Sequence, residues 1–214
     1  MSATPRHLLA VFLKFPEPGR VKTRLAAELG MEEATEIYRD LVAQTLRHLP
    51  WAMLEVWLCF DPPERREDVK AWLATHIPPH ANVLFVPQSA GDLGDRMRGV
   101  MEAVFAGPDT ASLTFIGTDC PELRWPVFVI TQRMPREMID AVFGASLDGG
   151  YYLVALRCPC PELFENIPWS TAHTLAASLA AAGRAGRSVH LLERRLRDID
   201  TAEDFRQWRA HGHT

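Results

Sequence analysis

The chain has 214 residues, of which 47% are hydrophobic and 23% are charged, and its formal net charge at pH 7 is −4. These values predict one globular domain over residues 1–214 with a sizeable core. The net negative charge argues against extended nucleic-acid binding, which needs many lysine and arginine side chains along one face. A small anionic ligand would need only a local basic cluster.

Nothing in the sequence predicts export or membrane insertion. The apolar run at residues 8–13 is too short for a secretory signal or for a membrane span. The cysteines lack the paired spacing of a zinc site, and we expect reduced thiols. They are Cys59, Cys120, Cys158 and Cys160. The sequence therefore predicts a cytoplasmic protein.

The apolar pattern predicts strands that alternate with helices. Residues 8–13 form a continuous apolar run, which is typical of a strand buried on both faces of a sheet. From Ala34 to Leu46 the apolar positions follow the three-and-four spacing of an amphipathic helix. Further strands are predicted at about 53–60, 82–86, 112–117, 141–145 and 151–157. This alternation predicts an α/β fold with a mostly parallel sheet.

The last third of the chain contains three more predicted elements. A helix is expected over about 169–182, followed by a strand at about 189–192. A final helix is expected over about 202–209. Just before it, Thr201 and Asp204 resemble a helix-capping arrangement, which explains part of this acidic segment without any catalytic role.

The loop after the first predicted strand concentrates positive charge. Ligands of open α/β sheets bind beyond the carboxyl ends of the strands, so this loop is a candidate site. Residues 14–24 carry one acid and four cations, which are Lys14, Arg20, Lys22 and Arg24. These cations could bind phosphate oxygens, and Gly19 would let the backbone approach a ligand closely. The alternative is a solvated loop whose charged side chains face water.

A second loop, at residues 87–97, carries groups suited to a nucleotide base. The amide of Gln88 offers both a donor and an acceptor, and Gly94 would allow a flat base to lie against the main chain. Arg96 adds a cation to the same loop. The alternative makes Asp92 an ordinary helix cap and the glycines ordinary turn residues.

Aspartates supply the candidate metal ligands. Asp119 directly follows a predicted buried strand, and Mg²⁺ and Mn²⁺ prefer hard oxygen ligands. The alternative is that Asp119 caps the next helix. Asp148 lies between two predicted strands, where a hairpin turn explains an Asp-Gly pair equally well. Of Asp198 and Asp200, which precede the last helix, we expect only one carboxylate to face a site.

These motifs together resemble a bacterial family of glycosyltransferase-like proteins in the nucleotide-diphospho-sugar transferase superfamily, often labelled radical-SAM/selenodomain-associated transferase 1. The resemblance spans nearly the whole chain and rests on several segments in order. They are residues 14–25, Gln88 with 91–97, 117–121, 148–152, 167–171 and 198–201.

The resemblance implies a glycosyltransferase-A-type fold, a single-domain, Rossmann-like three-layer sandwich with a mixed, mostly parallel sheet. It also implies a nucleotide sugar or a nucleotide, bound with Mg²⁺ or Mn²⁺. The candidate nucleotide- and phosphate-binding residues are Lys14, Gly19, Arg20, Lys22, Arg24, Gln88, Gly94 and Arg96. The candidate metal ligands are Asp119, with Asp200 or Asp148 as a second acidic contact. The candidate catalytic residues are Lys14, Arg24 and Asp119.

Three functions fit these residues. In the leading hypothesis, a metal and the basic loop stabilise a departing nucleoside diphosphate during glycosyl transfer to a small-molecule acceptor. The basic loop also resembles that of guanylyltransferases, which implies nucleotidyl transfer to a small phosphorylated substrate as an alternative. A second alternative is a non-catalytic nucleotide-binding module. The sequence identifies neither the base, the sugar, the acceptor nor the oligomeric state.

Overall fold

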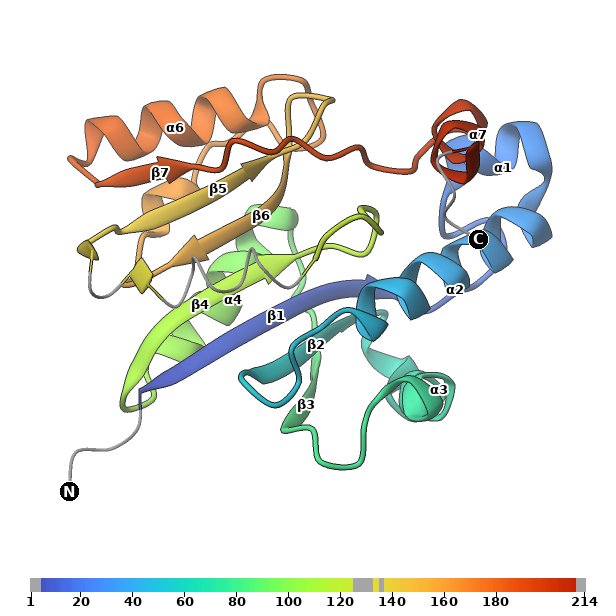
Figure 1. The fold of residues 1–214 in the computed structure, drawn as a ribbon, viewed down its shortest axis with the longest axis horizontal. Coiled ribbons are helices and arrows are strands. Elements are labelled where there is room, and N and C mark those ends of the chain that lie inside the picture. The colour runs from blue at the N-terminus through green and yellow to red at the C-terminus, as the bar shows by residue number, and fades with distance from the viewer. Residues whose placement is uncertain (1–4, 125–132, 135–136, 211–214) are drawn as a thin grey trace.

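Seven strands form one mixed sheet at the centre of the protein, in a computed structural model that describes residues 5–124, 133–134 and 137–210. The strands are β1 (Arg6–Lys14), β2 (Glu55–Asp61), β3 (Val83–Pro87), β4 (Thr110–Ile116), β5 (Ala141–Ala145), β6 (Tyr151–Leu156) and β7 (Val189–Leu191). Their order is β3-β2-β1-β4-β6-β5-β7; β6 is antiparallel to both of its neighbours, and the other pairs are parallel. The predicted mixed, mostly parallel sheet is therefore confirmed (Figure 1).

Helices cover both faces of this sheet and give the predicted three layers (Figure 1). One face carries α2 (Met31–Arg47) and α3 (Arg66–Leu73), and the other carries α4 (Leu93–Phe105) and α6 (Thr174–Arg184). Beyond the end of the sheet lie α1 (Thr23–Leu29) and α7 (Ala202–Ala210). Three short 3-10 helices complete the described elements: η1 (Pro63–Arg65), η2 (Ala74–His76) and η3 (Pro161–Leu163). None of the helices in the described part of the chain has the length and apolar composition that a bilayer span requires.

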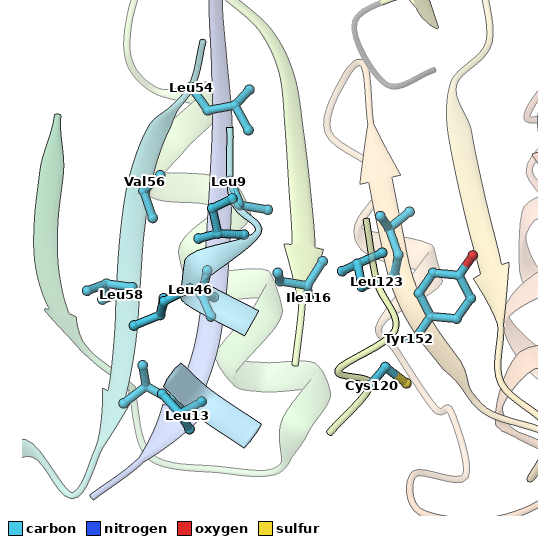
Figure 2. Packing of buried hydrophobic residues seen from close by; sticks show 14 of the residues in the cluster. Leu9, Leu13, Leu46, Leu54, Val56, Leu58, Ile116, Cys120, Leu123 and Tyr152 are labelled. Carbon is cyan, nitrogen blue, oxygen red and sulfur yellow. The ribbon is translucent and has the colours of Figure 1, made fainter. Parts of the chain in front are cut away.

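β1 is a central strand because both of its faces are apolar. Leu9 and Leu13 pack in the core beneath α2, whereas Leu8 packs in the core beneath α4, and all three are at most 2% exposed. Figure 2 shows Leu9 and Leu13 beside Leu46 of α2. Complete burial of one such leucine contributes roughly 1.5–3 kcal/mol. This packing fixes the end of β1, where the basic loop begins.

The C-terminal helix packs against the N-terminal part of the chain. Trp208 of α7 and Ile199, just before it, share a buried cluster with Leu25 of α1 and Leu41 of α2. Figure 1 accordingly shows α7 beside α1. This contact brings the acidic segment before α7 next to the basic loop that leads into α1. The short helix α1 lies at the end of that loop and was not predicted from the apolar pattern.

The start of α7 confirms the predicted capping arrangement. The backbone N–H of Thr201 donates to the carboxylate of Asp204 at 2.9 Å, and the backbone N–H of Asp204 donates to Thr201 Oγ1 at 3.2 Å. These bonds satisfy donors that the first turn of a helix otherwise leaves unpaired. Asp204 is therefore occupied by the helix end and is not available to a ligand.

The helix predicted over about 169–182 starts later than expected, at Thr174, and ends at Arg184. Ser170 has a φ of 59°, a left-handed conformation that a right-handed helix does not contain. Thr174 Oγ1 donates to the carbonyl of Pro168 at 2.8 Å and closes the turn that precedes the helix. The predicted start was wrong because the side chains of Thr171 and Thr174 stabilise a turn here instead.

Candidate functional site

A cleft of about 860 Å³ opens at the carboxyl ends of the parallel strands. Its walls come from the segments after β1, β3 and β4, from the turn between β5 and β6, and from the stretch before α7. The residues singled out in the sequence that line it are Lys14, Arg20, Lys22, Arg24, Gln88, Arg96, Asp119, Asp148, Asp198 and Asp200. Gly19 and Gly94 are not among the described residues that line this cleft.

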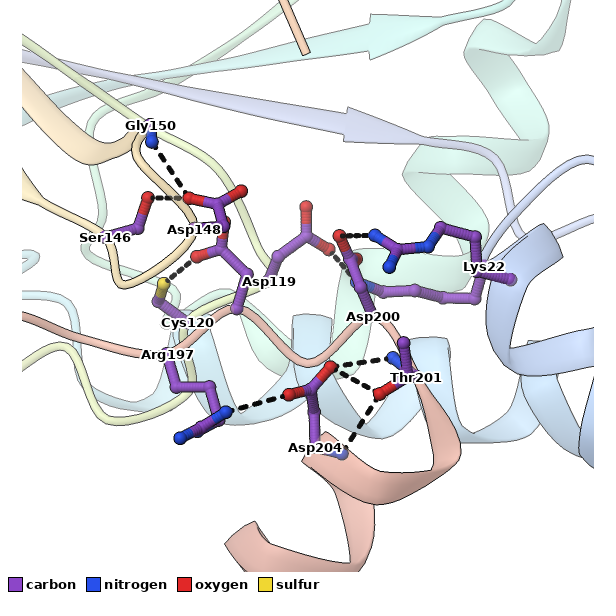
Figure 3. Close-up of polar contacts among 12 residues, drawn as sticks. Lys22, Asp119, Cys120, Ser146, Asp148, Gly150, Arg197, Asp200, Thr201 and Asp204 are labelled. Carbon is purple, nitrogen blue, oxygen red and sulfur yellow. Dashed lines mark hydrogen bonds and ion pairs between the residues drawn. The ribbon is translucent and has the colours of Figure 1, made fainter. Parts of the chain in front are cut away.

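Lys22 lies at the centre of the charged part of the cleft. Its Nζ is 2.5 Å from Oδ1 of Asp119 and 2.9 Å from Oδ1 of Asp200, and its side chain is 5% exposed. Because α7 packs on α1, Lys22 meets an aspartate 178 positions away (Figure 3). Arg24 forms a longer ion pair of 3.7 Å with Asp200, and its side chain is 71% exposed.

The ammonium group of Lys22 is charged and held in place. Burial by itself would lower the pKa of Lys22, but the carboxylates of Asp119 and Asp200 outweigh burial and raise this pKa above the usual lysine value. The backbone of Lys22 is left-handed, with φ 46° and ψ 46°, a conformation that costs a non-glycine residue about 1–2 kcal/mol. Such strained residues are concentrated at functional sites.

Asp148 adds a third carboxylate to the cleft and also shapes a turn. It lies between β5 and β6, two antiparallel strands, so the hairpin interpretation of the Asp-Gly pair is confirmed. One oxygen of Asp148 accepts hydrogen bonds from Ser146 Oγ at 2.6 Å and from the backbone N–H of Gly150 at 2.9 Å. The other oxygen has no hydrogen-bond partner within the described residues, so it is available to a ligand.

Asp198 is the fourth carboxylate that lines the cleft. It accepts a hydrogen bond from the thiol of Cys120. Burial, together with the negative charges of Asp119, Asp148 and Asp200, raises the pKa of Asp198 to about 7, against the opposing effect of the thiol hydrogen bond. The expectation that only one of Asp198 and Asp200 faces a site was wrong. Both line the cleft, because side chains two residues apart in an extended chain point to the same side.

Asp119 and Asp200 have the donor chemistry of a divalent-ion site. Their Oδ1 atoms converge on one point, and Mg²⁺ commonly uses one or two protein carboxylates together with substrate phosphates. That point is taken by the Nζ atom of Lys22. Within the described ranges, no three His, Cys, Asp or Glu side chains are placed to hold a metal together. The residues therefore fit an ion held by two carboxylates and a ligand, once Lys22 has moved.

Lys14 presents a free ammonium group to the same cleft. The hydroxyl of Tyr38, on α2, accepts from the backbone N–H of Lys14 at 2.8 Å and donates to its carbonyl at 3.1 Å. Burial raises the pKa of Tyr38 to about 12, so the hydroxyl keeps its proton for this bond. The ammonium of Lys14 has no hydrogen-bond or ion-pair partner among the described residues, unlike Arg20, which pairs with Glu17 at 3.4 Å. Lys14 is the cation most available to a phosphate.

Gln88 makes its hydrogen bonds to the protein. Its amide nitrogen donates to the carbonyls of Leu13 at 3.1 Å and Cys59 at 2.7 Å, which belong to neighbouring strands. Its amide oxygen accepts from Nη1 of Arg96 at 2.9 Å. Arg96 also donates through Nε to the carbonyl of Gly91 at 3.2 Å. Gln88 thus positions Arg96 at the cleft wall, while a contact of Gln88 with a base stays a prediction.

Gly94 serves the packing of α4. A Cβ atom at this position would lie 2.7 Å from Nε1 of Trp169 and closer still to the carbonyl of Phe164. Asp92 caps α4, as the structural alternative predicted: the backbone N–H of Asp95 donates to Asp92 Oδ1 at 2.9 Å. A role for Gly94 beside a base therefore stays a prediction, and the same holds for Gly19 beside a phosphate.

Sequence reasoning missed Tyr38 and Ser146 as residues that position the site. Tyr38 occupies a core-facing place in the apolar repeat of α2, so the pattern by itself describes it as a packing residue. Ser146 is a buried serine next to a turn, and only its hydrogen bond to Asp148 reveals a role. Neither role leaves a signal in local spacing.

Solved structures with the same fold place the protein in the nucleotide-diphospho-sugar transferase superfamily. It is similar to a proposed nucleotide-diphospho-sugar transferase from Desulfovibrio desulfuricans G20, with a TM-score of 0.86 and 30% identity over 99% of this chain and 90% of that chain. It shares its fold with 4-diphosphocytidyl-2C-methyl-D-erythritol synthase from Anaerococcus prevotii DSM 20548, with a TM-score of 0.60 and 11% identity over 98% and 97% of the two chains. It also shares its fold with CMP:2-keto-3-deoxy-manno-octonic acid synthetase complexed with CTP, with a TM-score of 0.57 and 14% identity over 97% and 98%.

The sequence also matches a family over most of its length. Residues 45–171 match DUF2064, a family of uncharacterized proteins conserved in bacteria. That stretch is more than half of the chain, so the chain belongs to this family. No curated protein sequence matches the chain. The fold is thus that of nucleotidyl and sugar transferases, and the structural neighbours are transferases.

Proposed function

We propose that this protein is a glycosyltransferase that uses a nucleotide-sugar donor together with Mg²⁺ or Mn²⁺. The observation that carries this proposal is the meeting of the basic loop with a pair of convergent carboxylates, Asp119 and Asp200, in one cleft. The cleft volume of about 860 Å³ is at the large end of the roughly 300–1,000 Å³ of small-molecule sites. The similarity to the Desulfovibrio protein supports sugar transfer over the alternatives.

In this proposal the cations bind the diphosphate of the donor. Lys14 and Arg24 would hold phosphate oxygens by charge-assisted hydrogen bonds, and Lys22 would join them once a phosphate is present. These side chains stabilise the negative charge that builds on the departing nucleoside diphosphate. No nucleophile needs to come from the protein, because the acceptor supplies the attacking oxygen.

The metal would be held by Asp119 and Asp200, with Asp148 as a further acidic contact. When bound, the ion would add Lewis-acid stabilisation of the leaving group. The free oxygen of Asp148 supports this assignment, since its other oxygen is already used in the turn. We further propose that the protein acts in the cytoplasm on a small-molecule acceptor and not on nucleic acid, in keeping with its net charge of −4.

A ligand panel tests this function. Melting temperature is measured with UDP- and GDP-sugars and with nucleoside triphosphates, each with Mn²⁺ or with EDTA. A ligand present at 100 times its Kd stabilises the folded state by about 2.7 kcal/mol. Preferential stabilisation by nucleotide sugars supports the proposal. Preferential stabilisation by triphosphates indicates nucleotidyl transfer, and a flat response indicates a module that does not bind nucleotides.

Asp119→Ala tests the metal assignment within the same panel. We expect this variant to lose the Mn²⁺-dependent part of nucleotide binding, measured by calorimetry, because it removes one of the two convergent carboxylates. Asp40→Ala is the matched control, since Asp40 is an exposed aspartate on α2 away from the cleft. If Asp119→Ala kept the wild-type gain in nucleotide affinity on addition of Mn²⁺, the assignment would be contradicted.

A further inference from the structure

Lys22 and a divalent ion compete for one point in the structure. Nζ of Lys22 lies within 2.9 Å of both Asp119 Oδ1 and Asp200 Oδ1. A divalent ion held by both of these oxygens would need the space between them, which Nζ fills. Figure 3 shows the side chain of Lys22 reaching Asp119 and Asp200. The ammonium and a divalent ion therefore exclude each other at this carboxylate pair.

We propose that Lys22 is a built-in competitor for the metal: its ammonium neutralises Asp119 and Asp200 in the ligand-free protein and moves to a substrate phosphate when a divalent ion takes the pair. This inference rests on the proposed function and adds a control of metal binding to it. The ion and the nucleotide would then bind cooperatively, because each supplies what the departure of Lys22 requires. The ion replaces its charge at the carboxylates, and the phosphate gives its ammonium a new partner.

The surroundings of Lys22 suit such an exchange. Its long, flexible side chain carries a point charge with three donors, so it can change partners without a change in the backbone. Lys14 and Arg24 line the same cleft and leave room for a shared anionic ligand. Asp148 adds a further carboxylate to the same cleft, which makes an incoming divalent ion more favourable. If Lys22 left without a replacement cation, Asp119 would lose this ion pair and Asp200 would keep only the longer one with Arg24.

Arg24 provides a matched control for charge alone. It forms an ion pair with the same Asp200, but at 3.7 Å and with a side chain that is 71% exposed. Arg24→Met removes one positive charge from the site, as Lys22→Met does, but it does not vacate the point between the carboxylates. A difference between these two variants therefore reports on the position of the cation and not on the net charge.

The test measures the affinity of the purified full-length chain for Mn²⁺, without nucleotide, by electron paramagnetic resonance. We expect Lys22→Met to bind Mn²⁺ about tenfold more tightly than the wild type or better, in the range typical of coupled sites. Arg24→Met should stay within about threefold of the wild type, because exposed charges are strongly screened. Lys22→Arg keeps a cation at the point and should keep the weak binding of the wild type.

Mn²⁺ affinity that is unchanged or weaker in Lys22→Met would overturn the inference. Circular dichroism with Mn²⁺ and with EDTA covers the case in which this variant folds poorly, since it removes the buried cation that pairs with both Asp119 and Asp200. Folding that is restored by Mn²⁺ supports the inference, and failure to fold with Mn²⁺ present overturns it. Lack of nucleotide binding by the wild-type chain would instead overturn the proposed function, so the two failures are distinguishable.

Discussion

Two polar corners of the cleft differ in how their polar and charged side chains are paired. In the Gln88 corner, formed by Gln88 and Arg96, hydrogen bonds run to backbone carbonyls and between neutral and charged side chains. In the Lys22 corner, formed by Lys22, Asp119, Asp198 and Asp200, charges meet charges and the acids outnumber the lysine.

This difference indicates that one corner shapes the cleft and the other responds to a charged ligand. The hydrogen bonds of the Gln88 corner are made within the protein, so its side chains set the form of the cleft wall. The Lys22 corner keeps an excess of negative charge beside one buried lysine, so a charged ligand would change the electrostatic energy of this corner more than that of the Gln88 corner. Mutations in the Gln88 corner should therefore change the free energy of unfolding. Mutations in the Lys22 corner should change how stability depends on pH and how tightly a metal binds.

The largest stability effect is expected for Gly94→Ala on α4, the helix that carries Arg96 of the Gln88 corner. The added Cβ would overlap the backbone carbonyl of Phe164 and approach the ring of Trp169, so α4 must shift. We expect a loss of about 2–3 kcal/mol in the free energy of unfolding, measured by urea denaturation. Gly99→Ala is the control on the same helix, where the nearest atom, Ser89 Oγ, is 3.6 Å away. The free energy of unfolding of that control should rise by up to about 1 kcal/mol. Equal losses in both variants would contradict the packing role of Gly94.

Gln88→Leu should cost about 2 kcal/mol of unfolding free energy, because it leaves buried carbonyls of Leu13 and Cys59 without their donor. The control is Gln44→Leu on α2, a half-buried glutamine that should change stability by less than about 0.5 kcal/mol. Both are compared by chemical denaturation. If Gln88→Leu kept full stability but lost nucleotide binding, the side chain would belong to the ligand site and the contrast between the corners would fail.

Asp198→Asn should change the pH dependence of stability by a smaller amount. The pKa of Asp198 is raised from 3.8 to about 7, so the unfolded chain releases this proton near pH 4 and the folded chain near pH 7. Stability therefore falls as pH rises through this window. The variant removes that loss, and we expect it to be more stable than the wild type by about 1–2 kcal/mol at pH 8 in EDTA, with no difference near pH 4.

Asp204→Asn provides a control with the opposite sign. Burial acts against it, but hydrogen bonds from Thr201 lower the pKa of Asp204, so its contribution is present above pH 4 and is lost as pH falls through the lowered pKa. This variant should be less stable than the wild type at pH 8. Thermal unfolding across the pH range checks both variants. Parallel pH curves for Asp198→Asn and the wild type would show that folding does not raise the pKa of Asp198.

Much of the architecture was predictable because it depends on local pattern. Buried strands are continuous apolar runs, so β1, β5 and β6 were predicted to within about two residues of their observed ends. The caps at Asp92 and Thr201 were predictable for the same reason, since a cap depends on neighbours three residues away. The start of α6 was not, because side-chain hydrogen bonds at Thr174 favoured a turn over a longer helix.

The sequence by itself determined the α/β layers, because the apolar period distinguishes strands from helices. It also determined that acids and bases gather at one edge of the sheet, because they stand in the loops that follow buried strands. Only the tertiary structure decided that Lys22 would lie between Asp119 and Asp200, since apolar periodicity shows that a helix face is buried but not what it is buried against. The packing of α7 on α1 supplied that answer. The pairing of β3 with β2 likewise brought Gln88 to the backbone of β1 and β2, which its local sequence does not show.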